Sequence, residues 1–192
     1  MNLFLSASVP LPTRHREFFD TADVIAIREA VKALVETALD DAVLVFGGHP
    51  AITPLIALLL RGMAPKYKRR VVLFQSAFFE GEFVEENTEF IDFQIVPADG
   101  DRERSLVTMR DYMLRSRRFD AAFFIGGMEG IWNEYRAFRA LHPGALCFPI
   151  ASTGAASLQL FREIAPARRD LLHELTYPTL FRNLLAEIRR RQ

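Results

Sequence analysis

The sequence has only one cysteine, Cys147, among its 192 residues. A single cysteine excludes a disulfide within the chain, and scarce cysteine is typical of a reducing compartment. We therefore expect a cytoplasmic protein. Cys147 lies within the apolar run 145–150, where a small buried side chain is more common than a reactive thiol.

The sequence also lacks net charge, because 24 Lys and Arg residues balance 24 Asp and Glu residues. A balanced chain has no overall attraction to nucleic acid or to an anionic membrane surface, so we expect neither as a partner. Basic residues gather at 115–118 and 189–191. We interpret both clusters as solvated helix ends, which the helix dipole favours.

Long hydrophobic runs and metal-ligand spacings are missing as well. The apolar run 55–60 is bracketed by Pro54 and Arg61, so it is too short to span a membrane. The apolar residues 1–5 lack the basic start and the length of a signal peptide. The four histidines have no ligand spacing, and no Gly-x-Gly-x-x-Gly follows the first expected strand. We therefore expect no metal and no coenzyme.

What the sequence does have is a regular alternation of short apolar runs and amphipathic stretches. Strands are expected at 2–7, 42–46, 70–75, 92–96, 119–125 and 145–150, and helices at 24–39, 51–62, 101–118, 129–141 and 177–191. This alternation predicts a single α/β domain over residues 1–192. We expect a Rossmann-like, mostly parallel sheet of about six or seven strands with helices on both faces. Residues 76–90 are rich in aromatic and acidic side chains, which predicts a short helix with loops that packs on a partner subunit.

Two strands end in a Gly-Gly pair that leads into a helix, Gly47-Gly48 and Gly126-Gly127. Glycine lets a ligand approach the backbone, and a helix N-terminus carries partial positive charge, so such turns bind phosphate. The plainer interpretation is that Gly-Gly simply ends a strand. Two copies favour a phosphate site between the turns. The ligand-binding residues predicted here are Gly47, Gly48, His49, Gly126, Gly127, Met128, Glu129 and Gly130.

Two further turns and one loop are candidates for the same pocket. The small-residue turns Ser6-Ala7-Ser8 and Ser152-Thr153-Gly154 each follow an expected strand, and we expect Ser6, Ser8, Ser152, Thr153 and Gly154 to bind ligand. The loop 9–20 carries Arg14, His15 and Arg16. These basic side chains either reach an anionic ligand or belong to an ordinary solvated loop.

The stretch from Gly126 to Glu134 resembles a motif of the SLOG superfamily, which includes the LOG phosphoribohydrolases and the DNA-processing Smf proteins. LOG enzymes carry Gly-Gly-x-Gly-Thr-x-x-Glu after a strand. Here the segment has one extra residue before Gly130, and Ile131 stands in place of Thr. Arg110 falls where LOG enzymes carry an arginine on the preceding helix, but the neighbouring His and Lys are absent.

The resemblance implies a single SLOG-like nucleotide-binding domain in which Glu134 and Arg110 are the catalytic residues. The plainer interpretations are a surface carboxylate and an exposed helical cation. The departures from the motif most resemble SLOG clusters associated with TIR-type effectors. They imply a sensor of a nucleoside phosphate or an ADP-ribose-like ligand in signalling or defence, a TIR-type effector partner and a homodimer. The alternative is a LOG-like phosphoribohydrolase that cleaves the N-glycosidic bond of a nucleoside 5′-monophosphate.

Overall fold

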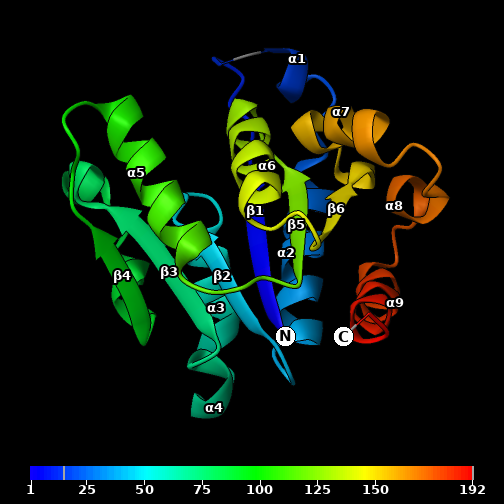
Figure 1. The fold of residues 1–192 in the computed structure, drawn as a ribbon, viewed down its shortest axis with the longest axis horizontal. Coiled ribbons are helices and arrows are strands. Elements are labelled where there is room, and N and C mark those ends of the chain that lie inside the picture. Colours follow the sequence, from blue (N-terminus) through cyan, green and yellow to red (C-terminus); the bar gives the residue numbers. More distant parts are fainter. Residues whose placement is uncertain (15, 192) are drawn as a thin grey trace.

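A computed structural model describes residues 1–14 and 16–191, so His15 lies outside the described residues. Its six strands form one sheet in the order β4-β3-β2-β1-β5-β6. All five strand pairs are parallel. The strands are β1 (Asn2–Ser8), β2 (Val43–Gly47), β3 (Val71–Ser76), β4 (Asp92–Val96), β5 (Ala121–Gly126) and β6 (Leu146–Ile150). The prediction of an α/β, Rossmann-like parallel sheet is confirmed (Figure 1).

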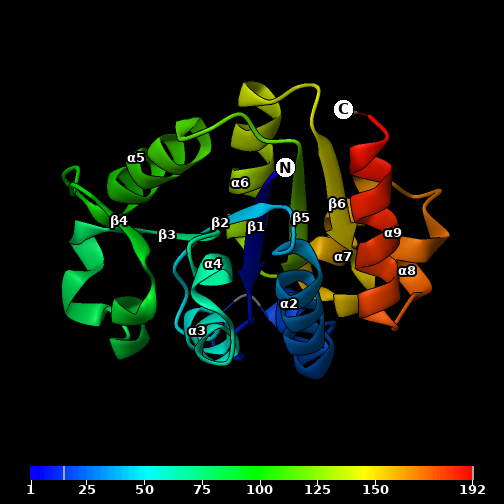
Figure 2. The same ribbon diagram turned by 90° about the horizontal axis from the view of Figure 1, so that it is seen from below.

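Helices cover both faces of this sheet (Figure 2). The α-helices are α1 (Arg16–Phe19), α2 (Val24–Ala38), α3 (Thr53–Arg61), α4 (Pro65–Lys68), α5 (Arg102–Arg115), α6 (Glu129–Leu141), α7 (Ala155–Ile164), α8 (Arg169–His173) and α9 (Tyr177–Arg189). Three 3₁₀ helices are η1 (Ala77–Glu82), η2 (Glu85–Glu89) and η3 (Ala151–Thr153). In the described part of the chain, no helix is long and apolar enough to cross a membrane.

Two apolar cores lie on the two faces of the sheet, and the side-chain alternation of β1 separates them. Leu3 and Leu5 point into the core that α2, α3 and α9 cover. Phe4 points into the other core, beneath α5, α6 and α7, where its ring stacks on Phe138 at 5.7 Å. Every residue of β5 is buried, as expected for a central strand with helices on both sides.

The chain changes direction across the sheet at β1. It first adds β2, β3 and β4 on one side of β1, and then returns through α5 to add β5 and β6 on the other side. In parallel α/β sheets, ligands bind outside the carboxyl ends of the strands at such a reversal. The fold therefore places a candidate site beyond Ser8 of β1 and Gly126 of β5, which are paired in register.

The elements differ from the expected ones mainly at their ends. Helix α3 begins at Thr53 rather than at 51, because a turn intervenes in which the Ile52 and Thr53 amides both donate to the His49 carbonyl. Helix α5 ends at Arg115 rather than at 118. The segment 76–90, where we expected a short helix with loops, folds into the two 3₁₀ helices η1 and η2.

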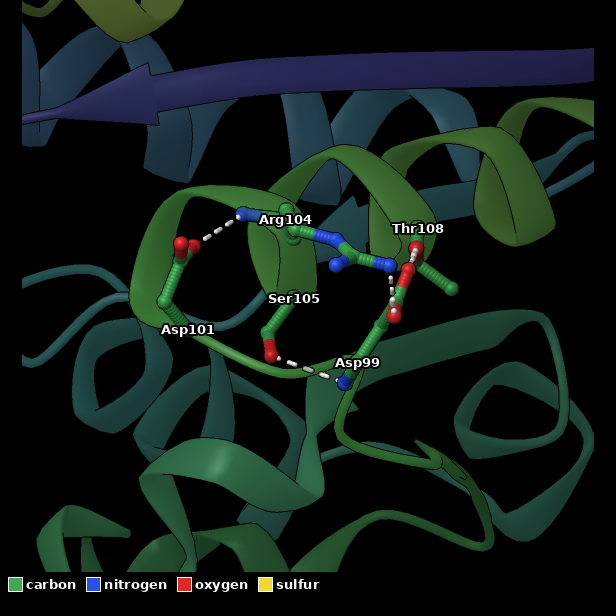
Figure 3. Close-up of polar contacts among 5 residues, drawn as sticks. All are labelled: Asp99, Asp101, Arg104, Ser105 and Thr108. Carbon is green, nitrogen blue, oxygen red and sulfur yellow. Dashed lines mark hydrogen bonds and ion pairs between the residues drawn. The ribbon is translucent and has the colours of Figure 1, made fainter.

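A set of polar contacts fixes the start of α5 (Figure 3). The Asp101 carboxylate accepts a hydrogen bond from the Arg104 amide at 2.9 Å. The Asp99 amide donates to the hydroxyl of Ser105, which is buried, at 2.9 Å. The Asp99 carboxylate accepts from the Thr108 hydroxyl at 2.8 Å and pairs with Arg104 at 3.0 Å. These contacts satisfy the first turn of α5 and hold the helix over the sheet.

We predict that Asp101→Ala lowers the free energy of unfolding by about 1 kcal/mol, because the first turn of α5 loses its cap. Asp111→Ala is the matched control on the same helix. Asp111 is exposed and pairs with Arg115 one turn away, a contact worth about 0.5 kcal/mol or less. Denaturant unfolding of the two variants measures the difference, and equal losses would contradict the capping role of Asp101.

Candidate functional site

A cavity of about 460 Å³ opens at the carboxyl end of the sheet. It is lined by the ends of β1, β2 and β3, by η1 and the residues after it, and by α5 and α6. Its volume lies within the range of small-molecule sites. The cavity occupies the place where the strand order reverses, so fold and cavity indicate the same site.

A carboxylate, a hydroxyl and a guanidinium meet in this cavity. The Ser6 hydroxyl at the end of β1 donates a hydrogen bond to Oε2 of Glu134 on α6. Nε of Arg110 on α5 lies 3.5 Å from Oε1 of the same carboxylate. The side chains of Arg110 and Glu134 are only 13 % and 17 % exposed. Three elements that are distant in sequence therefore converge on Glu134, and neither charged residue lies on a solvated helix face.

The environment of Glu134 acts on its charge in two directions. Burial raises the pKa of the Glu134 carboxyl, while Arg110 and the Ser6 hydrogen bond act to lower it. Arg110 Nε is buried and makes no hydrogen bond among the described residues, so its link to Glu134 is an ion pair rather than a tight hydrogen bond. The guanidinium reaches on toward Gly130, where an added Cβ would lie 3.9 Å from Nη2.

The N-terminus of α6 faces the same space. Met128 is its N-cap residue, and no side chain of the described residues caps this end. Met128, Glu129 and Gly130 all line the cavity. A helix N-terminus carries about half a positive charge and presents backbone N–H groups. Arg110 and the start of α6, two groups that attract anions, therefore lie in one corner of the cavity together with the carboxylates of Glu129 and Glu134.

The loop after β1 also reaches α6. Nη2 of Arg14 pairs with Oε1 of Glu129 at 2.9 Å, and both side chains are about two-fifths exposed. An exposed ion pair of this kind contributes little to stability. The ion pair instead holds the Arg14 side chain in the cavity wall, beside the first turn of α6.

The model of the SLOG cluster3 family matches residues 17–185. The chain belongs to this family. Among solved structures, it is similar to TM1055, an X-ray structure determined as target VT76 of the Northeast Structural Genomics Consortium, with 16 % identity and a TM-score of 0.59. The similarity covers 88 % of each chain and supports the fold alone. The comparison with curated proteins found no match.

In this SLOG protein, the amides of the second glycine turn make hydrogen bonds within the protein. The Gly126 amide donates to Thr153 Oγ1 at 2.9 Å, and the Gly127 amide donates to the Ser8 carbonyl at 2.8 Å. Neither glycine lines the cavity. Their φ angles of +61° and +81° require glycine for conformational reasons. The pair shapes the turn that aims α6, and both amides are engaged within the protein rather than aimed into the cavity.

The first glycine turn does line the cavity, but its amides are also engaged. The Gly48 amide donates to the Phe74 carbonyl at 2.9 Å, and the His49 amide donates to Thr53 Oγ1 at 3.0 Å. Gly47 and Gly48 form part of the wall. This turn therefore contributes shape, and the groups in the cavity wall that attract anions are the start of α6 and the side chains of Arg14, Arg102 and Arg110.

The structure places Ser152, Thr153 and Gly154 away from the cavity, which corrects the expectation that they bind ligand. Ser152 Oγ lies 3.2 Å from the Tyr177 hydroxyl. Thr153 is fully buried beneath Gly126, to which its Oγ1 is bonded. Gly154 has φ +71°, and a Cβ there would lie 1.8 Å from the Thr21 carbonyl oxygen. This turn therefore lies outside the cavity and contacts the second glycine turn through Thr153.

Sequence reasoning missed several cavity residues of the SLOG domain. Gln75 at the end of β3, Phe79 in η1, Phe83 after it and Arg102 at the start of α5 all line the cavity. Gln75 was detectable in principle, because it ends an apolar strand as Ser6 and Gly47 do. The two phenylalanines carry no such signal, since an aromatic residue in a short 3₁₀ segment reads equally well as packing.

His49 is held at the cavity wall as a neutral acceptor. Its Nδ1 accepts a hydrogen bond from the Ala51 amide at 3.2 Å. Burial lowers the pKa of His49 from 6.5 to about 4. At neutral pH the ring is therefore uncharged, and it contributes shape and an acceptor rather than a cation for an anionic ligand.

This shift predicts a pH dependence of stability. Between pH 6.5 and about 4 the unfolded state binds more protons at His49 than the folded state does. The stability tied to neutral His49 is therefore present above pH 6.5 and is lost as the pH falls through this window, by up to about 3 kcal/mol. His49→Asn keeps an acceptor for the Ala51 amide and cannot titrate. We expect its unfolding free energy to fall less between pH 7 and pH 4.5 than that of the wild type.

The control is His173→Asn, which changes an exposed histidine on α8. It should follow the wild-type pH curve in denaturant unfolding. Parallel curves for wild type and His49→Asn would show that folding does not lower the pKa of His49.

Proposed function

We propose that the cavity binds a nucleotide-derived ligand, either a nucleoside phosphate or an ADP-ribose-like molecule, and that the protein acts as a sensor of that ligand. The observation that carries this proposal is the convergence of the α6 N-terminus and the Arg110 guanidinium at Gly130, inside the cavity. Helix N-termini bind phosphate through backbone N–H groups, and arginine binds it through paired N–H donors. Membership of the SLOG cluster3 family supports a nucleotide-related ligand.

The other polar groups fit the sugar of such a ligand. Glu134 is an acceptor that a ribose hydroxyl can donate to, and it lies beside the anion-binding corner through Arg110. Ser6 fixes one oxygen of this carboxylate. In this arrangement the phosphate lies at the start of α6, and the ribose lies over the end of β1.

The residue at position 131 supports sensing over turnover. The related hydrolase motif has a threonine here, whose hydroxyl would lie in the first turn of the helix. Ile131 is instead buried, and a Cβ on Gly127 would lie 2.2 Å from its Cγ1. An apolar side chain packed against the turn offers no hydroxyl to a phosphate. With the altered motif, we propose a role in nucleotide signalling or defence, as a homodimer with a TIR-type effector partner.

The binding proposal is tested by changing Arg110. We expect Arg110→Gln to weaken binding of nucleoside monophosphates and ADP-ribose by about tenfold or more, because a charge-assisted hydrogen bond contributes roughly 1.5–3 kcal/mol. Titration calorimetry at two salt concentrations measures both the affinity and its salt dependence, which should decrease in the variant.

Arg115→Gln is the matched control, since Arg115 is exposed on the same helix and lies outside the cavity. It should bind like the wild type. Thermal unfolding checks that Arg110→Gln remains folded. Unchanged affinity in folded Arg110→Gln would remove the phosphate site from this corner.

A second candidate function is a phosphoribohydrolase. The observation that favours it is the carboxylate of Glu134, held within the cavity by Arg110 and Ser6. Cleavage of an N-glycosidic bond passes through a positively charged, oxocarbenium-like state, which a fixed carboxylate stabilises. Arginine then holds the phosphate or assists the departing base.

Glu134→Gln separates the two functions. For a sensor, wild-type protein should release no free base from AMP, CMP or GMP, and the variant should show altered affinity because a ground-state acceptor has lost its charge. For a hydrolase, the variant should bind nearly as well and lose turnover by about 100-fold or more. Chromatography of free base with both proteins side by side measures this. We expect no release by the wild type, and turnover that disappears in the variant would replace the sensor by the enzyme.

A further inference from the structure

The cavity has a second end that differs in character from the phosphate corner. This end is lined by Phe79 of η1, by Phe83 and Val84 after it, and by Leu106 and Met109 of α5. Apolar and aromatic groups of this kind do not serve a phosphate or a ribose. They fit a flat ring with little charge. Phe79, Phe83 and Val84 belong to the segment 76–90, which we expected to pack on a partner subunit.

The two phenylalanine rings are held in place by neighbours. Phe79 meets Phe78 edge to face, with ring centroids 5.1 Å apart, and the Arg102 guanidinium lies 5.7 Å from its centroid. Phe83 meets Phe93 of β4 edge to face at 5.8 Å. Rings held in this way are ordered before a ligand arrives, so binding a planar group against them requires less loss of side-chain entropy.

Gln75 adds the polar group at this end. Its carboxamide lies directly over Gly48, where an added Cβ would be 2.0 Å from Nε2 and 2.8 Å from Oε1. The carboxamide therefore packs directly on Gly48, and any larger residue at position 48 would displace it. Within the described residues, no hydrogen bond or ring contact involves the Gln75 side chain. A donor and an acceptor are thus presented to the cavity.

The two ends are spaced for one molecule. Gln75 ends β3, the glycine turn ends β2, Ser6 lies at the end of β1, and α6 follows β5. In the sheet these strands are consecutive neighbours in the order β3-β2-β1-β5. Adjacent strands lie about 4.8 Å apart, so roughly 14 Å separates the outer two. An extended nucleoside monophosphate spans such a row, with its phosphate at α6 and its base at β3.

We propose that Gln75 is the residue that reads the nucleobase of the ligand: the base lies against Phe79 and Phe83, and its polar edge pairs with the carboxamide seated on Gly48. This inference rests on the proposed nucleotide binding and adds the base subsite and its determinant. A carboxamide offers one acceptor beside two donors, and nucleobases carry a donor next to an acceptor on an edge. Bidentate pairing of this kind discriminates between bases.

The experiment compares nucleoside monophosphates with ribose 5-phosphate, which has the same phosphate and sugar but no base. We expect one or more of AMP, GMP, CMP and UMP to bind the wild type at least tenfold more tightly than ribose 5-phosphate. Gln75→Leu should reduce this ratio by about tenfold and leave the affinity for ribose 5-phosphate unchanged, because the phosphate end of the cavity is untouched. Titration calorimetry gives both affinities.

Two glycine variants test whether the position of the carboxamide on Gly48 matters, without changing Gln75 itself. Gly48→Ala should displace the carboxamide and reduce the ratio as Gln75→Leu does. Gly62→Ala is its control outside the cavity, since Gly62 follows α3 and the nearest atom to a Cβ there is the Leu59 carbonyl oxygen at 3.9 Å. The ratio should be retained in this variant. Thermal unfolding confirms that all three variants are folded.

The outcomes separate this inference from the function on which it rests. If ribose 5-phosphate binds and the nucleotides bind no better, or if folded Gln75→Leu keeps the wild-type ratio, the base subsite is overturned while the phosphate site stands. If Gln75→Leu weakens both ligands equally, Gln75 does not read the base. If neither ligand class binds, the proposed function is overturned, and the base subsite with it.

Discussion

The candidate site depends on the burial of one carboxylate. Removing a charged group from water is unfavourable by several kcal/mol unless partners replace the lost hydration. Glu134 has two such partners, the Ser6 hydroxyl and the Arg110 guanidinium. They come from β1 and α5, so the carboxylate on α6 links three elements that meet only in the folded chain. The need to pair this carboxylate constrains the positions of β1, α5 and α6. The cavity lies next to the three paired side chains.

The same requirement gives a reason for the polar contacts at the start of α5. Arg110 can serve Glu134 only if α5 has a fixed rotation and a fixed start. The Asp101 cap and the Asp99 contacts to Arg104, Ser105 and Thr108 hold the two turns that precede Arg110. On the opposite side, the positive φ angles of Gly126 and Gly127 aim α6 at the cavity. The positions of the charged side chains in the site are thus determined by backbone features one or two helical turns away.

Local sequence patterns predicted the fold but only part of the site. Strand and helix periodicity arises within a few residues, so the six strands and the main helices could be read with errors at their ends. The pairing of Arg110 with Glu134 depends on residues 24 positions apart, and only the resemblance to the SLOG motif brought them together. The glycine turns were located correctly, but the direction of their amides was not predicted. The partners of their amides, Thr153 and Ser8 for the second turn, come from distant segments, and no local pattern shows where an amide points.

One departure from the hydrolase motif, Ile131 in place of Thr, has a physical explanation in the packing of the cavity wall. Ile131 gives up a hydroxyl in the first turn of α6 and packs against Gly127 instead. The site then retains the start of α6, Arg110 and Glu134, the groups on which the proposed binding of a phosphate and a ribose rests. At the far end, Gly48 leaves room for the Gln75 carboxamide between the glycine turn and the aromatic rings. Loss of a contact near the reacting groups lowers turnover, whereas groups at the far end act on ground-state affinity. Under the proposed sensor function, affinity for the bound ligand is not limited by the need to bind a transition state more tightly.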